Sequence, residues 1–148
     1  MLLKSDCAAA AEPARVISHA GGRSLVAARD LAAGIIVATF DGPVVAFRGV
    51  PAEEIRYALW VGPDQWLVPM TPARFCDHSC EPNCAVDEDL NVISLRPVAE
   101  GEPLTFDYAL ADDPDAPESF WDPRWTFHCQ CGSPRCRGLI DRYVRPTP

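Results

Sequence analysis

The chain has 148 residues, of which 48% are hydrophobic and 23% charged, and its 13 basic and 21 acidic side chains give a formal net charge of −8. This length suits one domain with its own core, and the composition is that of a globular protein. A basic stripe for nucleic acid is missing, so we expect no direct binding to a phosphate backbone. The sequence also has no run of about 18 apolar residues, so we expect no membrane span.

The first residues, MLLKSDCAAAAEP, do not resemble a signal peptide because Lys4 and Asp6 interrupt a short apolar run. We therefore expect an intracellular, cytoplasmic protein, or a nuclear one in a eukaryote. The seven cysteines are then expected to be reduced, which favours metal binding over disulfides. The net charge leaves two interpretations open: attraction of a Lys- or Arg-rich partner, or solubility alone.

Short segments rich in Val, Ile and aromatic residues, separated by turn-forming residues, predict a mainly β protein of small sheets with a few short helical turns. The predicted strands are residues 14–19, 24–28, 35–40, 43–47, 57–61, 65–68, 91–95 and 104–106. Residues 57–68 are typical of a hairpin with Gly62 to Asp64 at its tip. Residues 51–59 contain the one helix start, with Pro51 at the first position and acids in the first turn.

The composition changes once, after Tyr108. Residues 109–123 contain five acidic residues, three prolines and no basic residue, which predicts a solvated loop. A small cysteine-rich segment follows. We therefore divide the chain into a main domain over residues 14–110, an acidic Pro-rich loop over 111–123 and a cysteine module over 124–141.

The cysteine module contains the sequence CQCGSPRC, a C-x-C-x4-C array. Gly and Pro within it allow a tight loop, so that the three sulfurs of Cys129, Cys131 and Cys136 can converge on one ion. Structural zinc takes four ligands, so a fourth has to come from elsewhere. The candidates are Cys7, Cys76, Cys80, Cys84 and His128. The alternative is a set of buried, inert thiols.

The segment RFCDHSCEPNC, residues 74–84, places three cysteines at i, i+4 and i+8. This spacing would line one helix face, but Pro82 disfavours a helix here. We therefore expect at most one or two of these cysteines to serve a common site. A nucleophilic cysteine paired with His78 is an alternative, although a two-residue spacing rarely brings such side chains together.

Three motifs in this order resemble the SET-domain protein-lysine methyltransferases. They are GGRSLVAARDLAAG (21–34), RFCDHSCEPNC (74–84) and GEPLTFDYA (101–109). The cysteine module resembles the post-SET element of that family, and the resemblance covers about residues 14 to 141. It implies a SET domain over 14–110 and a post-SET zinc module over 124–141, without a pre-SET module. It also implies a pseudo-knot in which residues 74–80 thread beneath a loop near 105–108.

The resemblance also implies the chemistry of the site: S-adenosylmethionine as methyl donor, a protein lysine as acceptor and a structural zinc ion. Cys80 would join the three cysteines of the module around zinc. Tyr108 matches the catalytic tyrosine, and Tyr57 resembles a second tyrosine of the lysine channel, with strand packing as the alternative. Phe106 lacks a hydroxyl, which implies products beyond monomethyl-lysine. The implied contacts with the cofactor are Gly22, Arg23, Ser24, Arg74, Phe75, Asp77 and His78.

Two positions depart from the family pattern. Asp77 stands where the family usually has Asn, and Ser24 replaces the second glycine of its G-x-G stretch. These departures favour an alternative, a SET-like module that binds zinc, cofactor or peptide with weak or no turnover. A zinc-stabilised structural protein is a further alternative. As an enzyme, the protein is expected to act on a basic, Lys-containing partner such as a histone.

Overall fold

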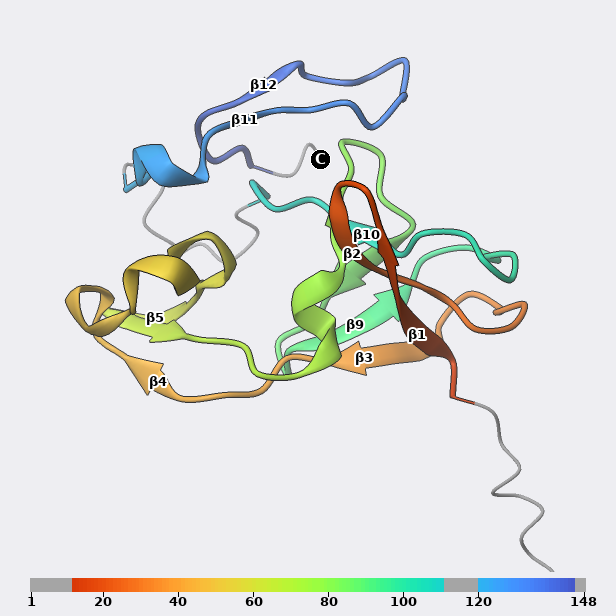
Figure 1. The fold of residues 1–148 in the computed structure, drawn as a ribbon, viewed down its shortest axis with the longest axis horizontal. Helices are drawn as coiled ribbons and strands as arrows, with labels where there is room; N and C mark the ends of the chain where they lie inside the picture. Colours follow the sequence, from red (N-terminus) through yellow and green to blue (C-terminus); the bar gives the residue numbers. More distant parts are fainter. Residues whose placement is uncertain (1–11, 111–119, 146–148) are drawn as a thin grey trace, which may run out of the picture.

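The computed structural model describes residues 12–110 and 120–145, and Figure 1 shows short strands joined by loops and single helical turns. The strands are β1 (Ala14–His19), β2 (Gly22–Ala27), β3 (Ile36–Thr39), β4 (Val44–Val45), β5 (Leu59–Gly62), β6 (Gln65–Leu67), β7 (Asp77–His78), β8 (Cys84–Val86), β9 (Asn91–Ser94), β10 (Thr105–Phe106), β11 (Phe127–His128) and β12 (Leu139–Ile140). The 3-10 helices are η2 (Phe47–Gly49), η3 (Ala52–Tyr57), η4 (Pro72–Phe75) and η5 (Pro123–Trp125). The predicted mainly β class is confirmed. In the described ranges, every helix is too short to cross a membrane.

The strands pair in several small sheets. β1 and β2 form an antiparallel hairpin, and two three-stranded sheets have the orders β3-β9-β8 and β4-β6-β5. β5 and β6 confirm the predicted hairpin, because they pair antiparallel up to Gly62 opposite Gln65. Asp64 lies in the turn with φ 49°, a left-handed conformation that Asp tolerates better than most residues.

The helix start predicted within residues 51–59 is confirmed as a short helical element that begins one residue later than expected. The structure has only the 3-10 helix η3, and Pro51 precedes it in an extended conformation with ψ 143°. Ile55 is the one residue of η3 that is buried. One buried side chain does not make an apolar stripe. Packing against the body therefore gives this six-residue helix little stabilisation that would extend it into an α-helix.

The core consists of two apolar clusters. The larger one packs β2, β3, β8 and β9 together, and the smaller one lies beside η3, where Trp66 and Ile55 meet Trp125. Cys76 and Cys84 belong to the larger cluster and are 1% and 0% exposed. The Cys76 thiol donates to the Leu104 carbonyl at 3.1 Å. These two cysteines are therefore packing residues, as free cysteine often is.

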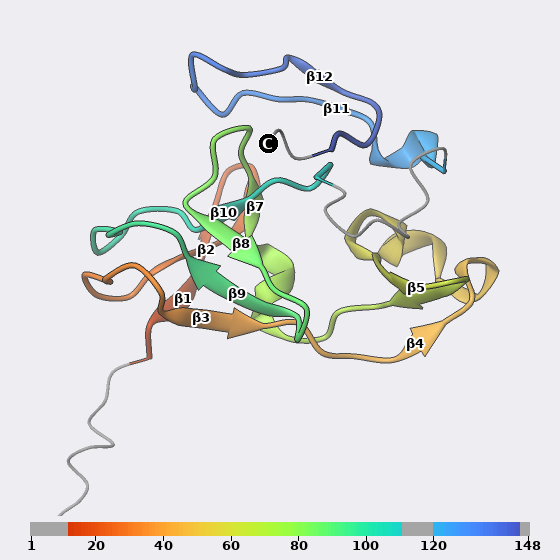
Figure 2. The same cartoon turned by 180° about the vertical axis from the view of Figure 1, so that it is seen from behind.

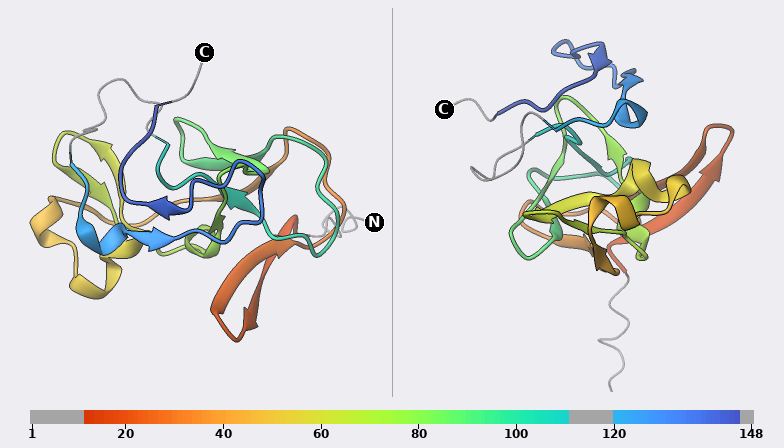
Figure 3. Two further views of the ribbon diagram at one scale, coloured as in Figure 1. Left: turned by 90° about the horizontal axis from the view of Figure 1, so that it is seen from above. Right: turned by 90° about the vertical axis from the view of Figure 1, so that its left-hand side faces the viewer.

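Two motifs that are far apart in sequence meet in a parallel strand pair. β7 pairs with β10, so that Asp77 lies opposite Thr105 and His78 opposite Phe106. The β11–β12 hairpin lies over this pair, as the opposite views of Figures 1 and 2 and the views of Figure 3 agree. The C-terminal segment thus covers the place where the two motifs meet. The predicted acidic loop over 111–123 lies mostly outside the described residues, and the three domain boundaries stay predictions.

Candidate active site and metal centre

A cavity of about 750 Å³ has walls from both the main body and the C-terminal segment. This volume lies within the range of small-molecule sites, about 300 to 1,000 Å³. The side chains that line it are mostly aromatic or basic: His19, Phe40, Arg56, Tyr57, Ala58, Leu59, Arg74, Cys76, Asp77, His78, Phe106, Tyr108, Trp121, Arg124, Trp125, Thr126, Phe127, Cys129, Gln130, Cys131 and Tyr143.

The cavity gathers only part of the predicted site. The predicted residues that line it are Tyr57, Arg74, Asp77, His78, Phe106 and Tyr108, whereas Gly22, Arg23, Ser24 and Phe75 do not. The β1–β2 hairpin instead reaches the cavity through His19, whose Nε2 lies 2.7 Å from the Ser24 hydroxyl. The Arg23 guanidinium lies over the Phe75 ring at 5.5 Å. Ser24 is therefore placed to position His19.

The Tyr108 hydroxyl lies at the inner, enclosed end of a side chain that is partly exposed. Although 39% of the residue is exposed, its hydroxyl donates a short hydrogen bond to the Cys76 carbonyl. Burial raises the pKa of Tyr108 well above its ordinary value, and the nearby Cys76 and Asp77 raise this pKa further. The hydroxyl is thus protonated at neutral pH. It can donate a hydrogen bond there, but it cannot act as a general base.

His78 connects Tyr108 to the thiols. Its Nδ1 accepts the backbone N–H of Tyr108 at 3.0 Å, and its Nε2 lies 3.5 Å from the Cys80 sulfur. Burial lowers the pKa of His78, and the nearby Asp107 carboxylate opposes that shift. We therefore assign a neutral ring with its proton on Nε2, since Nδ1 is the acceptor.

Phe106 and Tyr57 supply two different walls. The Phe106 ring lies 4.9 Å from the Tyr108 ring and 5.7 Å from the Phe40 ring, which makes an apolar surface beside the Tyr108 hydroxyl. Tyr57 lies beneath two guanidinium groups, that of Arg74 at 4.2 Å and that of Arg56 at 4.9 Å.

The C-terminal segment supplies an aromatic wall that the motifs did not predict. Trp125 donates its indole N–H to the Ile55 carbonyl at 2.7 Å, and the Trp121 ring lies 5.2 Å from the Tyr143 ring. The signal was the density of aromatic residues in FWDPRWTF, residues 120–127. Arg56 gave no such signal, because its place in the cavity depends on how the 3-10 helix η3 lies against the body.

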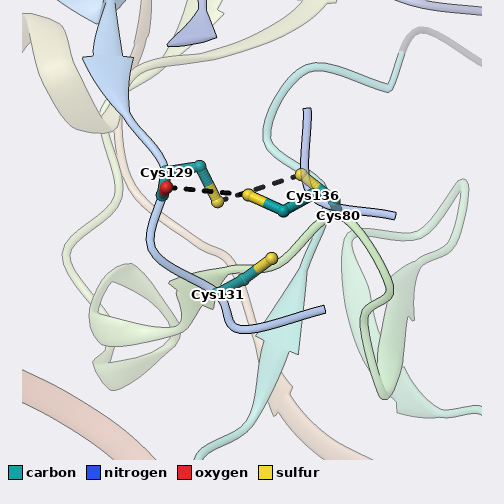
Figure 4. A group of neighbouring side chains, drawn as sticks. All are labelled: Cys80, Cys129, Cys131 and Cys136. Atoms are coloured by element: carbon teal, nitrogen blue, oxygen red, sulfur yellow. Dashed lines mark hydrogen bonds between the residues drawn. The ribbon is translucent and has the colours of Figure 1, made fainter. Parts of the chain in front are cut away.

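Four thiols converge beside the cavity. The sulfurs of Cys80, Cys129, Cys131 and Cys136 all lie within 4.8 Å of one another (Figure 4). Four thiolates at about 2.3 Å around zinc would be about 3.8 Å apart, and the sulfurs of Cys80 and Cys129 are 3.8 Å apart. The residues therefore fit a tetrahedral zinc ion. The structure selects Cys80 as the fourth thiol, while Cys7 lies outside the described residues.

Three of the four thiols have a pKa that departs from the ordinary value before a cation binds. Burial raises the pKa of Cys129 to about 12 and also raises the pKa of Cys80, whereas backbone N–H groups lower that of Cys131 to about 6. Because zinc binds thiolates, a bound ion would displace the protons that these thiols otherwise keep.

Comparison with known proteins agrees with this geometry. Residues 22–109 match the family model described as SET domain. The histone-lysine N-methyltransferase trithorax of Drosophila virilis is 32% identical over 143 residues, which cover 84% of this chain and 3% of that protein. Su(var)3-9 of Drosophila melanogaster, also named a histone-lysine N-methyltransferase, is 38% identical over 79 residues, 46% of this chain and 12% of that protein.

Methyltransferase flvH of Aspergillus flavus is 33% identical over 125 residues, which cover 82% of this chain and 61% of flvH. The chain thus spans a small fraction of the long histone-lysine methyltransferases and about three fifths of flvH. The family match covers more than half of the chain and contains the parallel pair that builds the cavity. The protein therefore belongs to the SET-domain family.

Proposed function

We propose that this protein is an S-adenosylmethionine-dependent protein-lysine methyltransferase. The observation that carries the proposal is the Tyr108 hydroxyl, bonded to the Cys76 carbonyl in a cavity beside Phe106 where the two motifs meet. The names of the similar proteins support the same reaction class, since trithorax and Su(var)3-9 are both named histone-lysine methyltransferases.

The cavity has residues that suit the cofactor. S-adenosylmethionine supplies a methyl group that is bound to a sulfonium sulfur. When the amine nitrogen forms its bond to the methyl carbon, the bond from that carbon to sulfur breaks and the sulfur leaves as a neutral thioether. Asp77 lines the cavity, and within the described residues its carboxylate makes no hydrogen bond or ion pair. This carboxylate can accept a charge-assisted bond from the amino group of the cofactor. The aromatic wall around Trp121 and Phe127 offers flat apolar faces for its ring system.

The acceptor amine has to be neutral to attack. Free lysine, with a pKa of about 10.4, is almost fully protonated at pH 7, so the site must favour the neutral form. The apolar Phe106 surface would remove water from the amine, and the guanidinium group of Arg56 would disfavour a second positive charge, whereas that of Arg74 is paired with Glu54 at 2.9 Å. The Tyr108 hydroxyl would orient the amine and the methyl group, and alignment would supply much of the rate.

The acceptor is proposed to be a basic, Lys-containing protein such as a histone. The formal charge of −8 supports a cationic partner. The absence of a hydroxyl on Phe106 supports products beyond monomethyl-lysine. The roles of Tyr57 as a channel residue, of zinc as the structural ion and of the predicted cofactor contacts belong to this proposal.

The test is methyl transfer from tritiated S-adenosylmethionine to histones and to cell lysate. We expect label on substrate lysine, and we expect Tyr108→Phe to lower kcat at least about 100-fold while calorimetry shows retained cofactor binding. Tyr143→Phe is the matched control, because it removes a hydroxyl from another ring of the same cavity. Lys4 is the only lysine in the chain, so Lys4→Arg removes self-labelling on lysine.

Three outcomes would contradict the proposal or the role that it assigns to Tyr108. Cofactor binding without transfer to any acceptor would favour the weakly active or inactive SET-like module. No cofactor binding at all would favour a zinc-stabilised structural protein. Equal losses in Tyr108→Phe and Tyr143→Phe would remove the assigned role of Tyr108.

A further inference from the structure

An ion pair joins the C-terminal segment to the residue that precedes Tyr108. The Arg137 guanidinium contacts the Asp107 carboxylate in a two-pronged arrangement, with Nη1 to Oδ2 at 3.0 Å and Nη2 to Oδ1 at 2.9 Å. The Asp107 side chain is only 7% exposed and that of Arg137 is 30% exposed. A bidentate pair of this kind fixes orientation as well as distance.

Each end of this pair is attached to a functional group. The backbone N–H of Arg137 points to the Cys80 sulfur at 3.4 Å, so the arginine is held by the thiol cluster. Asp107 Oδ1 accepts the backbone N–H of Ala109 at 3.0 Å and lies 3.7 Å from His78 Nδ1. That same nitrogen accepts the backbone N–H of Tyr108. The contacts therefore surround the Tyr108 backbone.

The contacts close a ring through the site. It runs from Cys80 to the backbone of Arg137, through the guanidinium to Asp107, along the chain to the Tyr108 N–H, and from that N–H to His78, whose Nε2 lies 3.5 Å from Cys80. Tyr108 is held to this ring by its own N–H and by the chain bond to Asp107. A displacement of the C-terminal segment would consequently move or release the backbone that carries the Tyr108 hydroxyl.

We infer that Arg137 is a positioning residue, which holds the C-terminal segment against Asp107 so that Tyr108 keeps its place in the cavity. The expected effect on kcat rests on the proposed function, whereas the expected effect on hydrogen exchange does not. Arg137 touches neither the cavity nor the four sulfurs with its guanidinium, so its effect has to pass through Asp107. Removing one partner would leave a nearly buried carboxylate without its main cation, which is unfavourable and loosens the turn at Tyr108.

The experiment compares variants of the full chain. Arg137→Gln removes the charge, Arg137→Lys keeps the charge without the two-pronged contact, and Asp107→Asn removes the opposite charge. Arg142→Gln is the matched control, because Arg142 forms an ion pair with Asp141 in the same segment but is 76% exposed. For Arg137→Gln we expect kcat to fall about 10- to 100-fold, with KM for S-adenosylmethionine changed less than about threefold. Arg137→Lys should recover only part of that loss.

A second readout does not depend on catalysis. Hydrogen exchange measured by mass spectrometry should become at least about tenfold faster in the peptide containing residues 104–110 of Arg137→Gln. Zinc content should remain that of the unmutated protein, and Arg142→Gln should change neither exchange nor kcat. The double variant of Arg137→Gln and Asp107→Asn should be no worse than either single variant, since both remove one interaction.

The outcomes separate this inference from the proposed function. If no acceptor is ever methylated, faster exchange in residues 104–110 still supports the positioning role. Unchanged exchange there, or loss of zinc that explains the whole effect of Arg137→Gln, would overturn it. So would equal effects of Arg137→Gln and Arg142→Gln on kcat.

Discussion

The reacting end of the site depends on a few side chains whose protonation is set by their surroundings. The Tyr108 hydroxyl is kept protonated by burial, and His78 is kept neutral, so both can hold positions without exchanging protons at pH 7. Asp77 and the guanidinium groups of Arg56 and Arg74 provide the charges around them. A proton that leaves the acceptor amine must therefore go to water or to a group other than Tyr108 and His78.

Phe106→Tyr should change the number of methyl groups added. A new hydroxyl on this ring would lie near Tyr108, whose ring is 4.9 Å away, and would hold a water or the amine where further methyl groups need room. We expect the main product to shift from di- or trimethyl-lysine to monomethyl-lysine. A mass-spectrometric time course on one peptide substrate measures this shift.

Phe127→Tyr is the control for that change, since Phe127 also lines the cavity but its ring lies farther from that of Tyr108, at 6.1 Å, and packs against His78 at 5.2 Å. Its product distribution should match that of the unmutated protein. If the unmutated protein itself stops at monomethyl-lysine, the interpretation of Phe106 is wrong.

Among the structural elements, residues 120–127 do the most to shape the cavity. Their aromatic rings meet those of η2 and β6, with Phe47 at 5.8 Å from Trp125 and Trp66 at 5.4 Å from it. The Trp125 indole N–H adds a hydrogen bond to η3. This segment therefore fixes one wall of the cavity to the body.

Trp125→Phe tests that attachment. The variant keeps an aromatic ring but loses the hydrogen bond to the Ile55 carbonyl, so we expect unfolding free energy to fall by about 1 to 2 kcal/mol. Trp121→Phe is the matched control, because its indole N–H bonds to Thr126 in the same segment, 3.0 Å away. Urea unfolding should show a smaller loss for Trp121→Phe, and equal losses would contradict the attachment.

The elements also show what the sequence could predict. The strands near residues 14–19 and 91–94 have enough apolar residues to be recognised, and the structure has them with similar bounds. β7 and β11 have two residues each, and their pairing depends on partners about thirty and twelve residues away. Short elements of this kind leave no periodicity, so only the resemblance to a family predicted that residues 74–80 pass near residues 105–108, and the register came from the structure.

The candidate site, like the fold, could be predicted from the sequence only in part. The resemblance implied the site roles of Tyr57, Asp77 and Tyr108, which line the cavity, and that of the Cys80 thiol, which lies in the cluster. The aromatic wall and the ion pair of Arg137 follow from how the C-terminal segment folds back over the body. Contacts between elements that far apart in sequence have no local pattern.

For the molecule as a whole, zinc should determine whether the C-terminal segment stays in place. Removal of zinc by a chelator is expected to lower the melting temperature and to abolish methyl transfer, because the segment carries both a cavity wall and Arg137. Cys80→Ser should reduce zinc content well below one ion per chain. Elemental analysis and thermal unfolding measure the two effects.

Cys84→Ser is the matched control for Cys80→Ser. Cys84 is 0% exposed and lies in the core, so its replacement should lower stability while leaving zinc content unchanged. Full zinc content in Cys80→Ser would show that this thiol is not a ligand.

The convergence of Cys80 with Cys129 has a consequence for the unfolded chain. These residues are 49 positions apart, so an ion held by both closes a long loop. In the chain-entropy model of a cross-link, closing a loop of this length removes about 4 kcal/mol of conformational freedom from the unfolded state. An ion that stays bound to both thiols after unfolding would therefore stabilise the fold as a cross-link does, and a chelator would remove this effect.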